Sequence, residues 1–140
     1  MPADGANVFT YGSLMYRRVW DRVVAGEYPA RPGTIRGFER RRIVGEVYPA
    51  LVPGSPERSV GGVVYLGVSA ADLAALDQFE GEAYRRIEVV VDTGDGSGLA
   101  AWTYAFVAVE RVDQTEWDAE RFAAEHLDYF LDTYCRERGR

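Results

Sequence analysis

The amino-acid sequence predicts one folded domain that mixes β-strands with helices. Its 140 residues are enough to bury a hydrophobic core within a single domain. Hydrophobic residues make up 47% of the chain and aromatic residues 13%, a composition that favours an α/β or β-rich fold over disorder. Short β-branched and aromatic runs alternate with segments of helical periodicity, and no linker or repeat divides the chain. We therefore expect residues 1–140 to form one domain.

The first elements are predicted to be a strand, a tight turn and a short helix. Residues 8–11 form a β-branched and aromatic run that is typical of a buried strand. The chain then turns at Gly12 and Ser13, and apolar residues recur with helical spacing over residues 16–24. Gly26 is placed to end this helix.

The middle of the chain is predicted to be mainly β-structure. Residues 34–38 and 42–47 are predicted strands. Residues 48–54 are expected to be an extended loop, because a residue before proline avoids the helical region. Residues 59–68 form a strong β-branched strand, and the two adjacent glycines within it indicate a bulge or a close approach of another backbone.

A helix and a hairpin are predicted next. Ser69 begins a helix over residues 69–80, with Asp72 three residues later as its capping partner. Residues 86–91 and 99–109 are predicted to form two strands joined by a glycine-rich hairpin loop. A phosphate-binding role for that loop is disfavoured because no helix follows it.

The clearest helix is predicted over residues 115–134. Its apolar residues fall along one stripe, and the sole histidine, His126, lies beside that stripe, which favours a packing or surface role. The stripe consists of Trp117, Ala124, Leu127, Leu131 and Tyr134, widened by Ala123 and Phe130.

The residue types present exclude several kinds of chemistry. The chain has no lysine, which removes Schiff-base catalysis. His126 and the single cysteine, Cys135, are nine residues apart, a spacing that does not bring them together on a helix, and they cannot form a usual zinc site. No Walker A or GxGxxG motif is present. A carboxylate acting with backbone amides is what remains for catalysis.

Charge and hydropathy limit the expected partners. The formal net charge of −6 argues against a nucleic-acid partner. The only dense basic run, Arg40, Arg41 and Arg42, is diluted by Glu39 and Glu46, so we expect it to be solvated or to pack within the fold. No apolar run approaches the roughly 18 residues of a membrane helix, and one cysteine suits a reducing, cytoplasmic setting. The sequence carries no indication of oligomeric state.

The first candidate site is the turn formed by Tyr11, Gly12, Ser13 and Leu14. Consecutive N–H groups at the start of a helix have no partner within it and lie near the positive end of its dipole, so they can hold a carboxylate. Glycine also lets a ligand approach the backbone closely. The alternative interpretation is a plain strand-to-helix turn with Ser13 as its N-cap.

The second candidate site is Glu80, where a helix gives way to a strand. Glu80 follows a phenylalanine and precedes a glycine, and catalytic groups are common at element ends that face a cavity. Apolar surroundings disfavour the charged form of a carboxylate and make it a better proton acceptor near neutral pH. Two alternatives stay open: a surface Glu80 paired with Arg85 or Arg86, and Glu82 as the reactive carboxylate, because residues two apart in an extended segment share a face.

Both segments resemble motifs of the γ-glutamylcyclotransferase-like superfamily, which includes the γ-glutamylamine cyclotransferases and the AIG2-like proteins. The family pattern is a strand ending in Tyr-Gly-Ser/Thr-Leu, then Gly-x-Val-Tyr, Leu-Asp-x-Phe-Glu-Gly, Tyr-x-Arg and a later strand with an aromatic residue. The resemblance spans about residues 7–107 and leaves the predicted helix of residues 115–134 outside it. The matching residues are, in order, Tyr11-Gly12-Ser13-Leu14, Gly62-Val63-Val64-Tyr65, Leu76-Asp77-Gln78-Phe79-Glu80-Gly81, Tyr84-Arg85-Arg86 and Tyr104.

The resemblance implies an α+β fold, a small mixed β-barrel flanked by helices, with a pocket at its mouth. It also implies a reaction in which the free α-amine of a γ-glutamyl amine or amino acid attacks its own γ-carbonyl group. Ring closure then yields 5-oxoproline and releases the amine. No cofactor and no metal are required for this chemistry.

The resemblance assigns a role to each candidate residue. Glu80 would be the general acid/base, and Arg86 would hold the segment of Glu80 in place. The amides of the turn would anchor the α-carboxylate of the substrate. The expected substrate-binding residues are Tyr11, Gly12, Ser13, Leu14, Tyr84 and Tyr104.

Two other functions would use the same pocket, because a fold does not secure an activity. One is a non-catalytic small-ligand-binding or stress-response module. The other is removal of a γ-glutamyl protecting group from a metabolite in a biosynthetic pathway. The sequence does not specify the leaving group, although residues 48–53 and the C-terminal helix are expected to shape that side of the pocket.

Overall fold

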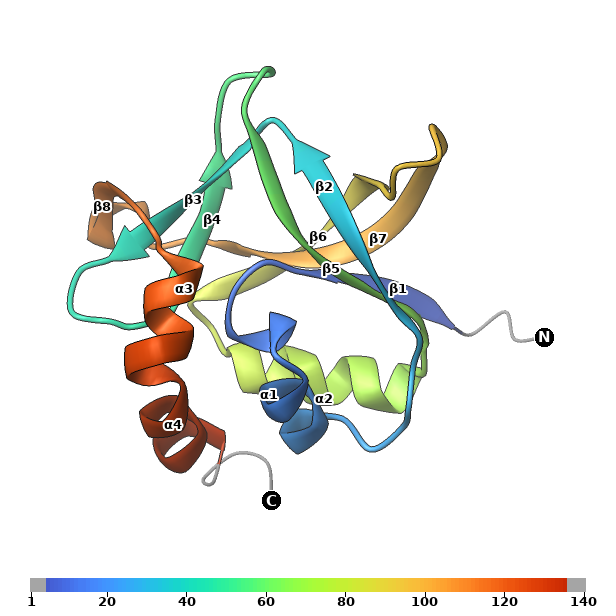
Figure 1. Cartoon of the computed structure of the whole chain (residues 1–140), viewed down its shortest axis with the longest axis horizontal. Coiled ribbons are helices and arrows are strands. Elements are labelled where there is room, and N and C mark those ends of the chain that lie inside the picture. Colours follow the sequence, from blue (N-terminus) through green and yellow to red (C-terminus); the bar gives the residue numbers. More distant parts are fainter. Residues whose placement is uncertain (1–4, 136–140) are drawn as a thin grey trace.

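The computed structural model describes residues 5–135, with side chains described through Thr133. Five strands form a closed barrel, in the order β1 (Ala6–Thr10), β5 (Ser59–Val68), β2 (Ala30–Arg36), β6 (Tyr84–Asp92) and β7 (Gly98–Phe106). Strand β1 runs antiparallel to β5 but parallel to β7, so the barrel is mixed. Figure 1 shows the helices gathered on one side of the barrel. This arrangement confirms the α+β fold, a small mixed barrel flanked by helices.

The strongest predicted strands are present in the barrel. Strand β5 has the predicted bounds, and β6 and β7 form the predicted hairpin, longer by two residues at the start of β6 and ending at Phe106 rather than residue 109. The predicted close approach of backbone also occurs within β5. A Cβ atom added to Gly62 would lie 2.0 Å from the carbonyl oxygen of Thr10 on β1, so only glycine fits there.

A second, three-stranded sheet lies beside the barrel, in the order β4 (Pro49–Pro53), β3 (Phe38–Ile43) and β8 (Val112–Glu116). The predicted strands over residues 34–38 and 42–47 are wrong in their bounds. Gly37 and Gly45, both at φ +82°, break the chain between β2 and β3 and again after β3. The prediction of a loop over residues 48–54 is also wrong, because this extended segment pairs antiparallel with β3.

The turn after β1 differs from the predicted direct passage into a helix. A 3-10 turn, η1 (Ser13–Met15), comes first, and helix α1 (Arg17–Val23) begins only after it. The prediction of Ser13 as an N-cap is therefore wrong. Tyr16 occupies that position of α1, and no side chain caps the helix there. The 3-10 turn forms because the amides of Met15 and Tyr16 donate hydrogen bonds to the carbonyl groups of Gly12 and Ser13, only three residues back.

Helix α2 (Ala70–Glu80) begins at the predicted cap. The hydroxyl of Ser69 accepts a hydrogen bond from the amide of Asp72 at 3.1 Å, as in a capping box. The Asp72 carboxylate does not complete the box; it accepts hydrogen bonds from the amides of Ala25 and Gly26, each at 2.9 Å, and from the Tyr28 hydroxyl at 2.6 Å. Through these hydrogen bonds, Asp72 holds the loop after α1 against the start of α2.

The C-terminal part of the chain departs most from its prediction. Residues 112–116 form strand β8, so the predicted helix is wrong at residues 115 and 116, and helical structure begins at α3 (Ala119–Arg121). A wide π-type turn, Phe122–His126, separates α3 from α4 (Leu127–Phe130), and a second one, Leu131–Cys135, follows. Each π-type turn adds a residue to the helical repeat and rotates the apolar face.

The predicted stripe on this helix is accordingly only partly correct. Phe130 and Leu131 are buried, and Leu127 is half-buried, whereas Ala123 and Ala124 are exposed. Phe122, which the 3.6-residue period left out, is buried. Trp117 is buried before the helix begins, and the side chain of Tyr134 lies outside the described residues.

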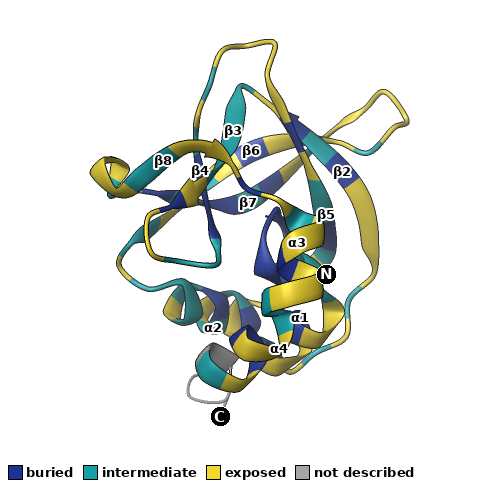
Figure 2. Ribbon diagram, turned by 60° about the vertical axis from the view of Figure 1, so that its left-hand side comes forward, coloured by how far each residue is buried: buried dark blue, intermediate teal, exposed yellow. Residues whose placement is uncertain are grey.

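Three hydrophobic clusters hold the described part of the chain together, and the smallest joins the three-stranded sheet to β7 through Ile43, Ala50 and Phe106. Of the two larger clusters, one fills the barrel. The second joins the barrel to the helices through Trp20 on α1, Leu76 on α2, and Phe122 and Phe130 of the C-terminal segment. Figure 2 shows that buried residues face these interfaces while the outer loops are exposed. None of the helices in the described part of the chain is long and apolar enough to cross a membrane.

Candidate active site

A cavity of about 230 Å³ lies between the end of β1, the end of α2 and the start of β6. This volume equals that of roughly eight water molecules at ~30 Å³ each, which suits a small ligand. All seven residues predicted for catalysis or substrate binding line this one cavity. They are Tyr11, Gly12, Ser13, Leu14, Glu80, Tyr84 and Tyr104.

The direction of the amides in the turn follows from what holds its carbonyl groups. The Tyr11 carbonyl accepts from Arg40 Nη1 at 2.8 Å, and those of Gly12 and Ser13 accept from the Met15 and Tyr16 amides at 3.0 and 3.1 Å. No described peptide bond is cis, and across a trans peptide the N–H points opposite to the preceding carbonyl. The amides of residues 12–14 therefore point away from these partners, none of which lines the cavity.

Two side chains from other elements secure this turn. Arg40, on β3, packs its guanidinium 5.3 Å from the ring centroid of Trp117, and burial lowers its pKa despite nearby acidic groups. The Tyr65 hydroxyl, from β5, donates to the Leu14 carbonyl at 3.3 Å, and its ring stacks on Trp20 at 3.7 Å. The packing role expected for Arg40 is therefore confirmed, and it includes support of the candidate anion-binding turn.

The need for a glycine at position 12 has a structural cause that the sequence did not reveal. A Cβ atom at this position would lie 2.7 Å from Cγ of Pro49 and 2.8 Å from its Cδ. The proline at the start of β4 fills the space that we expected a ligand to use. Pro49 in turn accepts a hydrogen bond on its carbonyl oxygen from the Tyr84 hydroxyl at 2.7 Å. Gly12 thus allows β4 to close one wall of the cavity.

Glu80 is the last residue of α2, and its position depends on the residue that follows. Gly81 ends the helix at φ +77° and ψ −167°, a conformation that is essentially restricted to glycine. Glu80 is half-buried in the cavity wall, whereas the rival carboxylate, Glu82, lines the same cavity but is exposed. Burial therefore favours Glu80 as the carboxylate that would meet an enclosed ligand.

Three tyrosines surround the carboxylate and remain neutral. Their hydroxyl groups donate to the protein: Tyr11 to the Tyr104 carbonyl at 2.6 Å, Tyr84 to Pro49, and Tyr104 to Asp77 Oδ1 at 2.7 Å. Burial, followed by the charge of Glu80, raises the pKa of Tyr11 well above its ordinary value. Burial likewise raises the pKa of Tyr84 and of Tyr104, the latter also through its bond to Asp77. The phenol oxygens of Tyr84 and Tyr104 can still accept a hydrogen bond from a ligand.

An ion pair fixes the end of α2 against the barrel. Arg86 Nε on β6 lies 3.0 Å from Asp77 Oδ1, the same oxygen that accepts from the Tyr104 hydroxyl. The Arg86 guanidinium also packs 4.5 Å from the ring centroid of Trp102. Because Asp77 lies one helical turn before Glu80, this network holds the segment of Glu80, as expected for Arg86.

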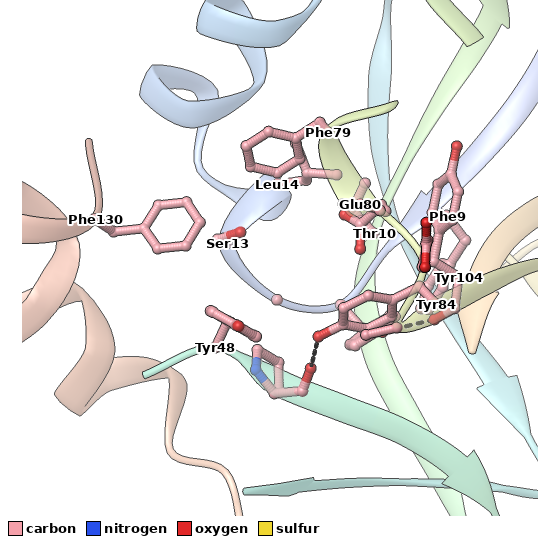
Figure 3. Close-up of a pocket in the computed structure, with 16 residues that line it drawn as sticks. Phe9, Thr10, Ser13, Leu14, Tyr48, Phe79, Glu80, Tyr84, Tyr104 and Phe130 are labelled. Carbon is pink, nitrogen blue, oxygen red and sulfur yellow. Dashed lines mark hydrogen bonds between the residues drawn. The ribbon is translucent and has the colours of Figure 1, made fainter. Parts of the chain in front are cut away.

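The far end of the cavity is aromatic. Figure 3 places Tyr48, Phe79 and Phe130 on one side, and Glu80, Tyr84 and Tyr104 on the other. The expected contribution of residues 48–53 and of the C-terminal helix is seen in Tyr48, Pro49 and Phe130. The sequence places Phe79 directly before Glu80, but Phe79 was not among the residues predicted to bind substrate.

The chain matches the family model described as gamma-glutamyl cyclotransferase, AIG2-like, over residues 8–121, and it belongs to that family. Among proteins similar to it, AIG2-like protein A of Arabidopsis thaliana is 33% identical over 130 residues, covering 91% of this chain and 78% of the relative. AIG2-like protein D of the same plant is 34% identical over 129 residues, covering 89% and 84%.

Solved structures share the fold. A solution structure of an Arabidopsis thaliana protein superimposes with a TM-score of 0.70 at 32% identity, covering 94% of this chain and 89% of that one. A structure titled gamma-glutamyl cyclotransferase superimposes with a TM-score of 0.64 at 20% identity, covering 78% and 69%. At that identity the likeness concerns the fold alone.

Proposed function

We propose that this protein is a γ-glutamyl cyclotransferase that converts a γ-glutamyl amine or amino acid into 5-oxoproline and a free amine, with Glu80 as general acid/base. The observation that carries the proposal is the meeting of Glu80 with the turn of residues 12–14 in one cavity. Membership of the gamma-glutamyl cyclotransferase, AIG2-like family supports the same reaction class.

The turn would anchor the α-carboxylate of the substrate. The amides of Gly12, Ser13 and Leu14 are directed away from their own carbonyl partners, and adjacent amides form a concave site for an anion. Helix α1 begins at Arg17, so the alignment of these amides, rather than the dipole of α1, supports this role. The neutral phenol oxygens of Tyr84 and Tyr104 can accept hydrogen bonds from the α-ammonium group.

Glu80 would move the protons that ring closure requires. Its carboxylate takes a proton from the α-ammonium, and the freed nitrogen lone pair attacks the γ-carbonyl carbon. A carbon–nitrogen bond forms and closes the five-membered ring. As the bond to the leaving nitrogen breaks, Glu80 relays the protons lost by the ring nitrogen to the leaving amine, which departs as an ammonium ion. No water is consumed, and the products contain every substrate atom.

The cavity would also supply the geometric part of catalysis. Amine and carbonyl belong to the same molecule, so the protein has only to hold the chain folded with its ends together. Well-oriented intramolecular reactions gain roughly 7–11 kcal/mol from this effect. Anchoring the α-carboxylate at the turn while Glu80 holds the amine would restrict the substrate in this way.

Product analysis tests the proposal. The protein is incubated with γ-glutamyl amines, γ-glutamyl amino acids and ε-(γ-glutamyl)lysine, and products are quantified by mass spectrometry. We expect 5-oxoproline and free amine in equal amounts from at least one compound. Release of glutamate instead of 5-oxoproline would mean hydrolysis and would contradict the proposal. Calorimetric binding of 5-oxoproline without turnover of any compound would favour the non-catalytic binding module.

A further inference from the structure

The aromatic end of the cavity has a defined geometry. The Phe79 and Phe130 rings meet edge to face, with centroids 6.2 Å apart and planes at 74°. Tyr48 meets Phe130 in the same manner at 6.3 Å and 73°. Rings that lie nearly at right angles to one another present both faces and edges. A further aromatic ring prefers to pack edge to face or offset-stacked against such surfaces.

These rings are supported from behind and are not loosely held surface residues. Phe130 is only 3% exposed and also packs against Phe122, at 5.6 Å between centroids. Phe79 lies on the last turn of α2, next to Glu80. The wall is therefore joined to both the C-terminal segment and the helix that carries the candidate acid/base.

The charge of the cavity lining is negative. Among the described residues that line it, Glu80 and Glu82 are the only charged side chains. The leaving group of a γ-glutamyl amino acid carries its own carboxylate. A carboxylate at the aromatic end would lose water without gaining a cation from the described lining residues.

We propose that the cavity selects γ-glutamyl compounds whose leaving group is an aromatic amine without a carboxylate. The inference rests on the proposed function and narrows its substrate class. With the glutamyl part between Glu80 and the turn of residues 12–14, the leaving group extends toward Tyr48, Phe79 and Phe130. In the view of Figure 3, Ser13 lies on the same side as Tyr48, Phe79 and Phe130, with Glu80 on the other side.

Three matched substrates test the two parts of this inference. γ-Glutamyl-phenethylamine differs from γ-glutamyl-phenylalanine only by the carboxylate, and γ-glutamyl-ethylamine lacks only the ring. We expect kcat/KM for the phenethylamine compound to exceed that for the phenylalanine compound by about tenfold or more, because a buried charge without a partner is costly. It should exceed that for the ethylamine compound by roughly tenfold, because the ring buries apolar surface.

The variant Phe79→Leu keeps an apolar side chain of the cavity wall but removes its ring. It should reduce the kcat/KM ratio of the phenethylamine compound to the ethylamine compound by about threefold. The kcat/KM ratio of the phenethylamine compound to the phenylalanine compound should stay unchanged. Tyr129→Leu is the matched control, since Tyr129 is 56% exposed and does not line the cavity. Its substrate preferences should equal those of the wild type.

Failure of the inference is distinguishable from failure of the proposed function. Equal or faster turnover of the phenylalanine compound would overturn the inference while the cyclotransferase activity stands. If no compound is turned over, the proposed function fails, and calorimetry with Glu80→Gln still compares the affinities of the three compounds. Binding of the phenylalanine compound as tight as that of the phenethylamine compound, or binding of neither, would then overturn the inference.

Discussion

Replacement of Arg40 by methionine is expected to destabilise the fold and to weaken the turn of residues 12–14. Arg40 Nη1 donates to the Tyr11 carbonyl at 2.8 Å, and the guanidinium packs on Trp117 at 5.3 Å. Methionine retains much of the apolar stem but neither interaction. The peptide between Tyr11 and Gly12 would lose the partner that sets its direction.

The expected loss of stability follows from these contacts. A hydrogen bond from a charged donor contributes about 1.5–3 kcal/mol, and a cation–π contact about 0.5–1 kcal/mol. Arg40 Nε is buried without a hydrogen-bond partner among the described residues, so its removal returns about 1 kcal/mol. The free energy of unfolding should therefore fall by about 2 kcal/mol.

Urea unfolding measures the stability change, and calorimetry with 5-oxoproline measures the effect on the turn. We expect the affinity for 5-oxoproline to fall about tenfold, the equivalent of ~1.4 kcal/mol. Arg36→Met serves as the control, because Arg36 is exposed on β2, and it should change stability by less than ~0.5 kcal/mol. A loss below ~0.5 kcal/mol for Arg40→Met with unchanged 5-oxoproline affinity would refute the assigned role of Arg40.

Three further substitutions probe the cavity wall. Gly81→Ala should lower the free energy of unfolding by about 1–3 kcal/mol, because φ +77° is strained for alanine, and urea unfolding measures this loss. The substitution should also slow turnover, measured as 5-oxoproline release, because Glu80 would shift. Gly12→Ala should lower the free energy of unfolding by about 1–3 kcal/mol, because the alanine Cβ would lie 2.7 Å from the ring of Pro49. Urea unfolding measures this loss. Burial and the bond to Asp77 raise the pKa of Tyr104, so its stabilising contribution is complete below pH ~10 and is lost as pH rises above it. Tyr104→Phe should therefore reduce the alkaline loss of stability by up to ~1.4 kcal/mol per pH unit in urea unfolding between pH 9 and 11.5.

Each of these expectations has a clear contrary result. Full stability of Gly81→Ala would mean that the end of α2 adjusts without strain. A Gly12→Ala variant as stable as the wild type would mean that Pro49 moves easily. An unchanged alkaline slope in Tyr104→Phe would mean that Tyr104 ionises normally in the folded protein.

The parts of the fold that sequence reasoning predicted are those governed by local pattern. Strand β5 has a long β-branched run, and the β6–β7 hairpin has strong strands around a glycine-rich turn. Strand β8 was missed because Val112–Glu116 is short and polar, and it becomes a strand only by pairing with β3. Burial of Phe122 depends on π-type turns, which a fixed 3.6-residue period does not anticipate.

The candidate site was predictable where a short motif contained it. Glu80 and the turn after β1 were identified from contiguous residues, and the fold brings them into one cavity. Arg40 was not assigned to the site, because its contact with Tyr11 joins residues 29 positions apart. The aromatic end likewise draws Tyr48, Phe79 and Phe130 from three separate segments, whose meeting only the folded chain reveals.

The central claim is that Glu80 moves the proton during ring closure, and a paired substitution tests it most directly. Glu80→Gln and Glu82→Gln change the two carboxylates of the cavity to amides of the same shape. For Glu80→Gln we predict a fall in 5-oxoproline release of at least about 100-fold, the usual contribution of general acid–base catalysis, with 5-oxoproline binding retained. Glu82→Gln should stay within about threefold of the wild type. Full activity of Glu80→Gln, or the large loss in Glu82→Gln instead, would contradict the assignment.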